Sequence, residues 1–254
     1  MDKKYLVCID PGHGPGCVNG SPDGTYKERE FAWDMGLRLR ALLEEAGVRV
    51  MVTRGEEEKP SLSRRARLSN SLDTDLFVSL HSNAAGSSGW SDPSGLLIYT
   101  SRPGEEAGRN KAARAILARM EEAGVKLFGG GLFKNGYTVL TATNAPAVLI
   151  EYGFHTNQGD VALLKDTNYR ELLAKATVNG ILDYLGISEA EEDREEGLDN
   201  IPDPWAAVAV TKAIKAGVIQ GSDTGDLALH STVDKQTMMV IFDRLGLLDG
   251  KERV

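Results

Sequence analysis

The sequence predicts an α/β fold, with a twisted, mixed and mostly parallel sheet flanked by helices, followed by a small helical C-terminal domain. Two observations support this prediction. In residues 1–188, short apolar runs of strand length alternate with longer segments whose apolar residues repeat at helical spacing, an order typical of a sheet covered by helices. A strongly acidic stretch then separates this part from a second unit that shows only helical patterns.

Five short apolar runs have the length and composition of strands. They lie at residues 5–10, 49–53, 76–81, 96–99 and 147–152. Two glycine-rich stretches, residues 86–95 and 128–133, are expected to be surface loops, because glycine adopts dihedrals that other residues avoid and supports few packing contacts. Loops of this kind next to strand ends commonly border a binding site.

The clearest helix signal lies between the first two predicted strands. Apolar side chains there repeat at three- and four-residue spacing and are followed by Gly47, a residue type typical of a helix C-terminus. The repeating positions are Phe31, Met35, Leu39, Leu42, Leu43 and Ala46. Further helices are predicted at residues 63–72, 105–124 and 169–185.

The composition is that of a globular protein without a disulfide framework. The 254 residues are 41% hydrophobic and 26% charged, which suffices for a sizeable core. Cys8 lies inside an apolar run and is predicted to be a small core residue, whereas Cys17 lies in a glycine-rich loop. The first residues lead directly into a strand, and no segment has the size of a signal peptide or a membrane span. We therefore expect synthesis in the cytoplasm without a signal peptide.

The formal charge of −8 is concentrated in one segment. Residues 189–200 contain seven acidic side chains and one basic side chain, whereas residues 201–254 contain seven and six. The acidity is therefore expected to belong to a linker and not to a substrate-binding face. No basic patch with interleaved aromatic residues is present in the sequence, so we expect no nucleic-acid partner.

Four residues far apart in the chain have the chemistry of a zinc hydrolase. His13, His81 and Glu151 each lie at the end of a predicted strand, and the carboxyl ends of strands in an open α/β sheet share one edge where ligands bind. Two imidazoles and a carboxylate are a recurrent ligand set for catalytic zinc, and a further carboxylate suits a general base. Glu28 opens the first helix and can reach the same edge, although Glu30 competes with it on position alone.

Each of these residues also has an ordinary structural explanation. A histidine at a strand end is commonly a hydrogen-bonded structural residue, and a glutamate in a first helical turn commonly interacts with the helix dipole. Glu151 is different, because it lies within the apolar run Val148-Leu-Ile-Glu151, where its carboxylate would be buried. Buried acids are rare unless they are paired or functional.

Several sequence blocks occur in a recognisable order along residues 1–188, around the helix that runs from Glu28 to Gly47. The blocks are Ile9-Asp-Pro-Gly-His-Gly14, Val50-Met-Val-Thr-Arg54, Leu62-Ser-Arg-Arg-Ala66, Val78-Ser-Leu-His-Ser-Asn-Ala84 and Val148-Leu-Ile-Glu-Tyr-Gly-Phe-His-Thr-Asn157. In this order they resemble the successive motifs of the zinc-dependent N-acetylmuramoyl-L-alanine amidases of the amidase 3 type. The resemblance implies a zinc amidase catalytic domain over residues 1–188.

The resemblance also implies a role for each of the four residues. His13, Glu28 and His81 would bind Zn²⁺, and Glu151 would be the catalytic acid and base. The family's glutamate lies nineteen residues before the glycine that ends the helix, which selects Glu28 over Glu30.

Three further residues are predicted to contact substrate, namely Asn83, His155 and Asn157. The chain departs from the family at His155, where a small or apolar residue is common, and at Pro15, where a second glycine is common. His155 is expected either to donate a hydrogen bond to the metal ligands or to lie at the rim of the site and contact substrate. Pro15 is expected only to reshape a loop.

The activity that the resemblance implies is hydrolysis of the amide bond between N-acetylmuramic acid and L-alanine in peptidoglycan. The favoured role is a phage endolysin, made in the host cytoplasm and acting on the cell wall after the membrane has been permeabilised. The alternatives are a bacterial autolysin, a non-catalytic wall-binding protein on the same scaffold, and a different zinc peptidase or deacylase.

Residues 201–254 predict a small helical domain behind the linker at 189–200. Two short helices are expected at residues 204–216 and 234–245, with a turn between them at Gly217 and Gly221. The blocks that begin at Trp205 and Gly217 resemble a single S-layer-homology repeat, which implies binding of a secondary cell-wall polymer. The repeat's usual Thr-Arg-x-Glu stretch is replaced here by Asp234-Lys-Gln236. The alternative is a helical hairpin that only packs or dimerises, and the oligomeric state is left open.

Overall fold

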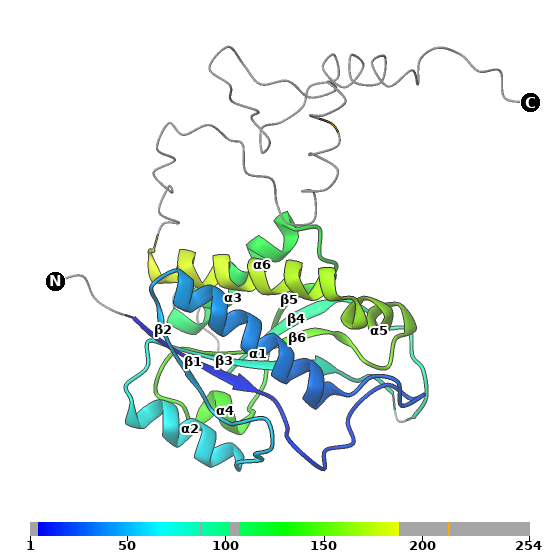
Figure 1. The fold of residues 1–254 in the computed structure, drawn as a ribbon, viewed down its shortest axis with the longest axis horizontal. Coiled ribbons are helices and arrows are strands. Elements are labelled where there is room, and N and C mark those ends of the chain that lie inside the picture. The colour runs from blue at the N-terminus through cyan, green and yellow to red at the C-terminus, as the bar shows by residue number, and fades with distance from the viewer. Residues whose placement is uncertain (1–4, 87, 102–106, 188–212, 214–254) are drawn as a thin grey trace, which may run out of the picture. The chain divides into compact units, whose positions relative to one another are not determined.

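A six-stranded sheet lies at the centre of the computed structural model, which describes residues 5–86, 88–101, 107–187 and 213 (Figure 1). The strands are β1 (Leu6–Pro11), β2 (Arg49–Val52), β3 (Leu76–Asn83), β4 (Leu96–Thr100), β5 (Leu127–Lys134) and β6 (Ala147–Phe154). The predicted linker at 189–200 and the predicted helices of 201–254 lie outside the described residues.

The strands lie in the order β2-β1-β3-β6-β4-β5. The pairs β1–β2, β1–β3, β3–β6 and β4–β5 are parallel, and the pair β4–β6 is antiparallel. This arrangement confirms the predicted mixed, mostly parallel sheet. Because β1, β3 and β6 are parallel, their carboxyl ends meet at one edge, as the position of the candidate site requires.

Helices cover both faces of the sheet (Figure 1). α1 (Glu28–Glu45), α3 (Gly108–Glu122) and α6 (Thr167–Leu185) lie on one face, α2 (Leu62–Ser71) and the short α4 (Thr138–Thr141) lie on the other, and α5 (Gln158–Lys165) follows β6. Strand residues alternate between the two cores, as the period of a β-strand requires: Val7 and Ile9 pack in the larger core, and Cys8 packs with Phe77 in the smaller one. The predicted core position of Cys8 is confirmed.

The first helix forms as its sequence pattern predicts. Phe31, Met35, Leu39 and Leu43 are fully buried, and Gly47 follows the helix end with φ +77°, a left-handed conformation that glycine adopts without strain. Among the described residues, no helix combines the length and the apolar character needed to cross a membrane.

The glycine-rich stretch 128–133 is not the surface loop that the composition predicts, because it lies inside β5. The register explains the difference: Leu96 pairs with Leu127, but two residues further along β4, Ile98 pairs with Leu132. The three extra residues on β5 bulge out at Gly129–131, all of which have positive φ. Glycine therefore serves here to interrupt the pairing and not to end the strand. The loop predicted at 86–95 contains no helix or strand among its described residues, as expected.

Candidate active site

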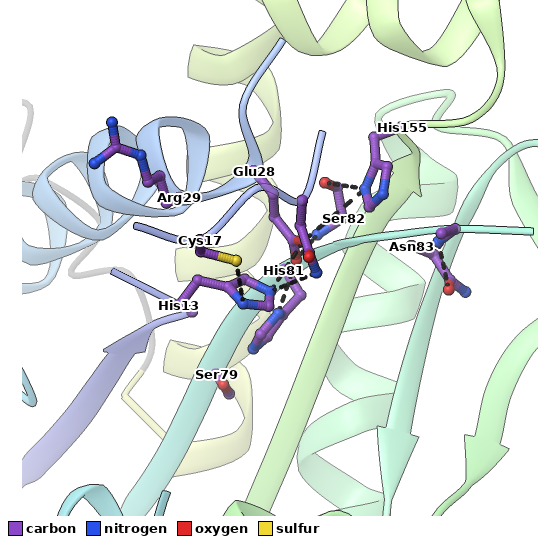
Figure 2. A network of polar contacts seen from close by, with 12 residues as sticks. His13, Cys17, Glu28, Arg29, Ser79, His81, Ser82, Asn83 and His155 are labelled. Carbon is purple, nitrogen blue, oxygen red and sulfur yellow. Dashed lines mark hydrogen bonds and ion pairs between the residues drawn. The ribbon is translucent and has the colours of Figure 1, made fainter. Parts of the chain in front are cut away.

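The four candidate residues meet at the carboxyl edge of the sheet and line one cavity, and Figure 2 shows three of them, His13, Glu28 and His81, side by side. His13 lies two residues after β1, Glu28 is the first residue of α1, and His81 lies near the end of β3. Glu151 lies in β6 directly opposite His81 in the parallel pairing of the two strands. The structure thus brings together residues that are up to 138 positions apart in the chain.

The carboxylate of Glu28 lies between the two imidazole rings. Nε2 of His13 is 3.0 Å from Oε2 of Glu28, and Nδ1 of His81 is 2.8 Å from Oε1. The backbone N–H of Ser82 donates to the same Oε1 at 3.0 Å. The possible ligand atoms of the three side chains all lie within 4.8 Å of one another, so a single metal ion can contact all three.

The electrostatics of the three residues are coupled. Burial disfavours the charged form of Glu28, but the hydrogen bonds from His13 and His81 outweigh it and hold the pKa of this carboxyl well below its usual range. Burial likewise disfavours the charged form of His81, and the hydrogen bond to Glu28 reverses the effect and raises the pKa of this imidazole to about 8. Glu28 is therefore ionised at neutral pH and can act as a ligand without losing a proton.

Glu151 has a different environment from Glu28. It is 7% exposed, and its Oε2 atom has no hydrogen-bond partner among the described residues. Burial, together with the negative charge of Glu28, raises the pKa of Glu151 to about 8, although His81 acts in the opposite direction. Two buried carboxylates at one site thus differ strongly in their affinity for protons, the pattern typical of an acid and base beside a ligand.

Close backbone packing sets the distance between the two histidines. A Cβ atom on Gly12 would lie 2.4 Å from Cε1 of His81, so the ring of His81 can occupy its position only beside a glycine. His13 follows with φ +59°, a left-handed conformation that is uncommon for a residue with a side chain. The Asp-Pro-Gly-His-Gly block therefore builds a tight turn that directs His13 back toward α1.

Further side chains surround the ligands in ways that the sequence did not reveal. Sγ of Cys17 lies 3.2 Å from Nδ1 of His13, on the opposite side of the ring from Glu28. Oγ of Ser82 lies 3.0 Å from Nδ1 of His155 and accepts a hydrogen bond from the hydroxyl of Tyr26 at 2.9 Å. No motif identified the contacts of Ser82, because they join residues that are 56 and 73 positions apart, and the contact of Cys17 depends on the turn that places His13 beside it.

The three residues predicted to contact substrate do not all lie at the cavity. His155 is 5% exposed, and both it and Asn83 line the cavity at the site. Asn157 instead caps α5, where its Oδ1 accepts from the N–H of Asp160 at 3.1 Å, and it is not among the residues that line the cavity. Glu30 lies apart from the ligands and forms exposed ion pairs.

The candidate ligands open into a cavity of about 830 Å³. Its polar end contains His13, Glu28, His81 and Glu151. The remaining wall is partly apolar and includes Leu62, Tyr137 and Val139. A cavity of this size accommodates a ligand as large as a disaccharide or a short peptide.

The chain belongs to the Amidase_3 family of N-acetylmuramoyl-L-alanine amidases, whose model matches residues 7–183. The matched region contains the whole sheet and all four candidate site residues. The family and the amidase fold suggested by the sequence motifs are thereby confirmed.

Named relatives agree with this assignment. The chain is 29% identical over 181 residues to the probable cell wall amidase LytH of Staphylococcus aureus, a match that covers 70% of this chain and 58% of LytH. The chain therefore spans somewhat more than half the length of this curated relative.

Solved amidases share the fold. The N-acetylmuramoyl-L-alanine amidase of Clostridium difficile 630 matches with a TM-score of 0.66 and 27% identity, covering 73% of this chain and 98% of that one. AmiC2 of Nostoc punctiforme matches with a TM-score of 0.63 and 30% identity, covering 73% and 99%. The catalytic domain of the CD27L endolysin, at 22% identity and a TM-score of 0.56, shows the same fold.

Proposed function

We propose that this protein hydrolyses the amide bond between N-acetylmuramic acid and L-alanine in peptidoglycan, with Zn²⁺ bound by His13, Glu28 and His81. The observation that carries the proposal is the ionised, buried carboxylate of Glu28 between two imidazoles, at the polar end of a large cavity. Membership of the amidase family supports the choice of bond.

The donor set fits zinc. Two imidazole nitrogens and one carboxylate oxygen form a recurrent catalytic zinc set, whereas magnesium and calcium prefer sites made of oxygen atoms. When bound in such a set, zinc lowers the pKa of a coordinated water and polarises the scissile carbonyl. Three protein ligands leave a further position for water or substrate.

Glu151 supplies the proton transfers. Its carboxyl lies opposite His81 and has one oxygen without a partner, so it can accept a proton from the attacking water. The same carboxyl then donates that proton to the nitrogen of the departing L-alanine, which leaves as an amine. A carboxyl whose pKa lies near neutrality can perform both steps.

Two substitutions test the assignment of roles. Glu151→Gln is expected to retain zinc and to lower kcat by about 100- to 10,000-fold, because only the proton transfer is lost. His13→Ala is expected to lose both zinc and activity. Glu30→Gln is a matched control, because this exposed carboxylate lies outside the site. A Glu151→Gln enzyme with a near-normal rate on cell walls would refute the role of this residue.

The products and the metal give an independent check. Mass analysis of digested wall is expected to show free stem peptides with N-terminal L-alanine and intact glycan strands, which a peptidase or a deacylase would not produce. Removal of zinc by a chelator is expected to abolish activity, and added zinc should restore it. Activity that survives complete removal of the metal would exclude zinc from the mechanism.

The role of the whole protein is part of the same proposal. We propose a phage endolysin that reaches the wall after membrane permeabilisation and binds a secondary wall polymer through residues 201–254. The support is the resemblance of the sequence motifs to those of the amidases and, in residues 201–254, to an S-layer-homology repeat. Full-length protein is expected to lyse intact cells faster than residues 1–188 alone, and equal rates would contradict the binding role of the C-terminal part.

A further inference from the structure

Two buried arginines hold the turn that carries His13. Arg54 and Arg65 are 4% and 2% exposed. Arg54 donates from Nε to the carbonyl of Pro11 at 2.9 Å and from Nη2 to that of Gly12 at 3.2 Å. Arg65 donates from Nη1 to Pro11 at 2.7 Å and from Nη2 to the carbonyl of His13. Three successive carbonyls at the end of β1 therefore accept hydrogen bonds from guanidinium groups.

Arg54 also connects this turn to the start of α1. Its Nη2 donates to the carbonyl of Arg29, the residue after Glu28, at 3.2 Å. Its Nη1 donates to the carbonyls of Gly55 and Glu56 at 3.1 and 3.2 Å. A guanidinium has five N–H groups, and here each has a backbone acceptor. One planar group thus links the segments that carry two of the three candidate ligands.

Arg65 is anchored by a second set of side chains. Its Nη1 forms a buried ion pair with Oδ1 of Asp10 at 2.8 Å. Asp10 in turn accepts from Oγ1 of Thr53 at 2.5 Å and from Oγ of Ser79 at 2.7 Å. Through Asp10 the arginine is therefore fixed to β1 and β3, so it offers a rigid support for the left-handed conformation of His13.

We infer that Arg54 and Arg65 are positioning residues for the metal site: they fix the turn of His13 against the start of α1, so that His13 and Glu28 reach one ion together. The inference rests on the proposed zinc function. Lysine cannot replace either residue, because one ammonium group carries its donors at a single point and cannot reach carbonyls spread around a planar fork.

The test measures zinc affinity and not only activity. Full-length Arg54→Lys and Arg65→Lys are stripped of metal and titrated with zinc against a chromogenic chelator. Each is expected to bind zinc about 10- to 100-fold more weakly than the wild type, the usual effect of losing a residue that orients a metal ligand. The kcat of each zinc-loaded variant should fall, and for Arg54→Lys the KM should stay within about twofold, because Arg54 does not line the cavity.

Two control variants separate positioning from general destabilisation. Arg38→Lys removes a guanidinium that pairs with Asp34 and Glu171, away from the site, and should leave zinc affinity unchanged. Ile181→Val removes a methyl group from the buried core, so it should lower the melting temperature. It should also leave the zinc affinity unchanged.

The outcomes distinguish the two proposals. If Arg54→Lys and Arg65→Lys melt earlier but bind zinc as the wild type does, the inference is overturned. If the wild type itself binds no zinc, the proposed function fails instead. Because Arg54 and Arg65 both donate to carbonyls of the same turn, either variant alone decides the question when the other does not fold.

Discussion

Replacing Glu151 by glutamine is expected to stabilise the metal-free protein, by an amount that grows between pH 5 and pH 7. Burial raises the pKa of Glu151 from its ordinary value of 4.5 to about 8. Between these values the folded protein binds more protons at this residue than the unfolded chain does, so its stability falls as the pH rises. At about 1.4 kcal/mol per pKa unit, the free-energy cost of this carboxyl is about 1 kcal/mol at pH 5 and about 3 kcal/mol at pH 7.

The measurement compares urea unfolding of chelator-treated wild type and Glu151→Gln at pH 5, 6 and 7. The amide has its own burial cost, but that cost does not depend on pH and cancels when the pH values are compared. The advantage of the variant should therefore increase by about 2.5 kcal/mol from pH 5 to pH 7. Glu30→Gln, whose carboxylate is exposed, should show no such trend. A difference for Glu151→Gln that is constant over this range would refute the reasoning.

Two glycine substitutions test close contacts in the fold and the site. Gly12→Ala would place a Cβ atom 2.4 Å from Cε1 of His81. Zinc affinity, measured by competition with a chelator, should therefore fall about 10-fold or more. Gly55→Ala is the control, because its Cβ atom would have its nearest contact at 3.6 Å, and it should bind zinc as the wild type does. Gly180→Ala would place a Cβ atom 2.4 Å from Cα of Ile116 and force α6 away from α3. It should cost about 1–3 kcal/mol in urea unfolding with zinc affinity unchanged, and a variant as stable as the wild type would contradict this packing.

The sequence predicted most of the sheet, because β1, β2, β3, β4 and β6 are short apolar runs. It did not predict β5, because three consecutive glycines, which usually indicate a loop, form a bulge there that only the register with β4 makes visible. The four-residue helix α4 and the eight-residue helix α5 were also not predicted, since neither is long enough to show a repeating apolar pattern.

The sequence by itself determined which side chains are available as metal ligands and as a general base, because residue types and strand ends are local properties. It placed His13, His81 and Glu151 at strand ends that share an edge. It could not choose between Glu28 and Glu30 without the family motif, because both occupy the first turn of the same helix.

Only the tertiary structure decided how these residues act, because burial and hydrogen bonding depend on contacts between distant segments. The structure buries Glu28 between two imidazoles and leaves one oxygen of Glu151 without a partner, which moves their pKa values in opposite directions. It also shows Arg54 and Arg65 bound to the turn of His13. Both arginines were present in the sequence motifs, but their role depends on backbone carbonyls that the fold alone brings within reach.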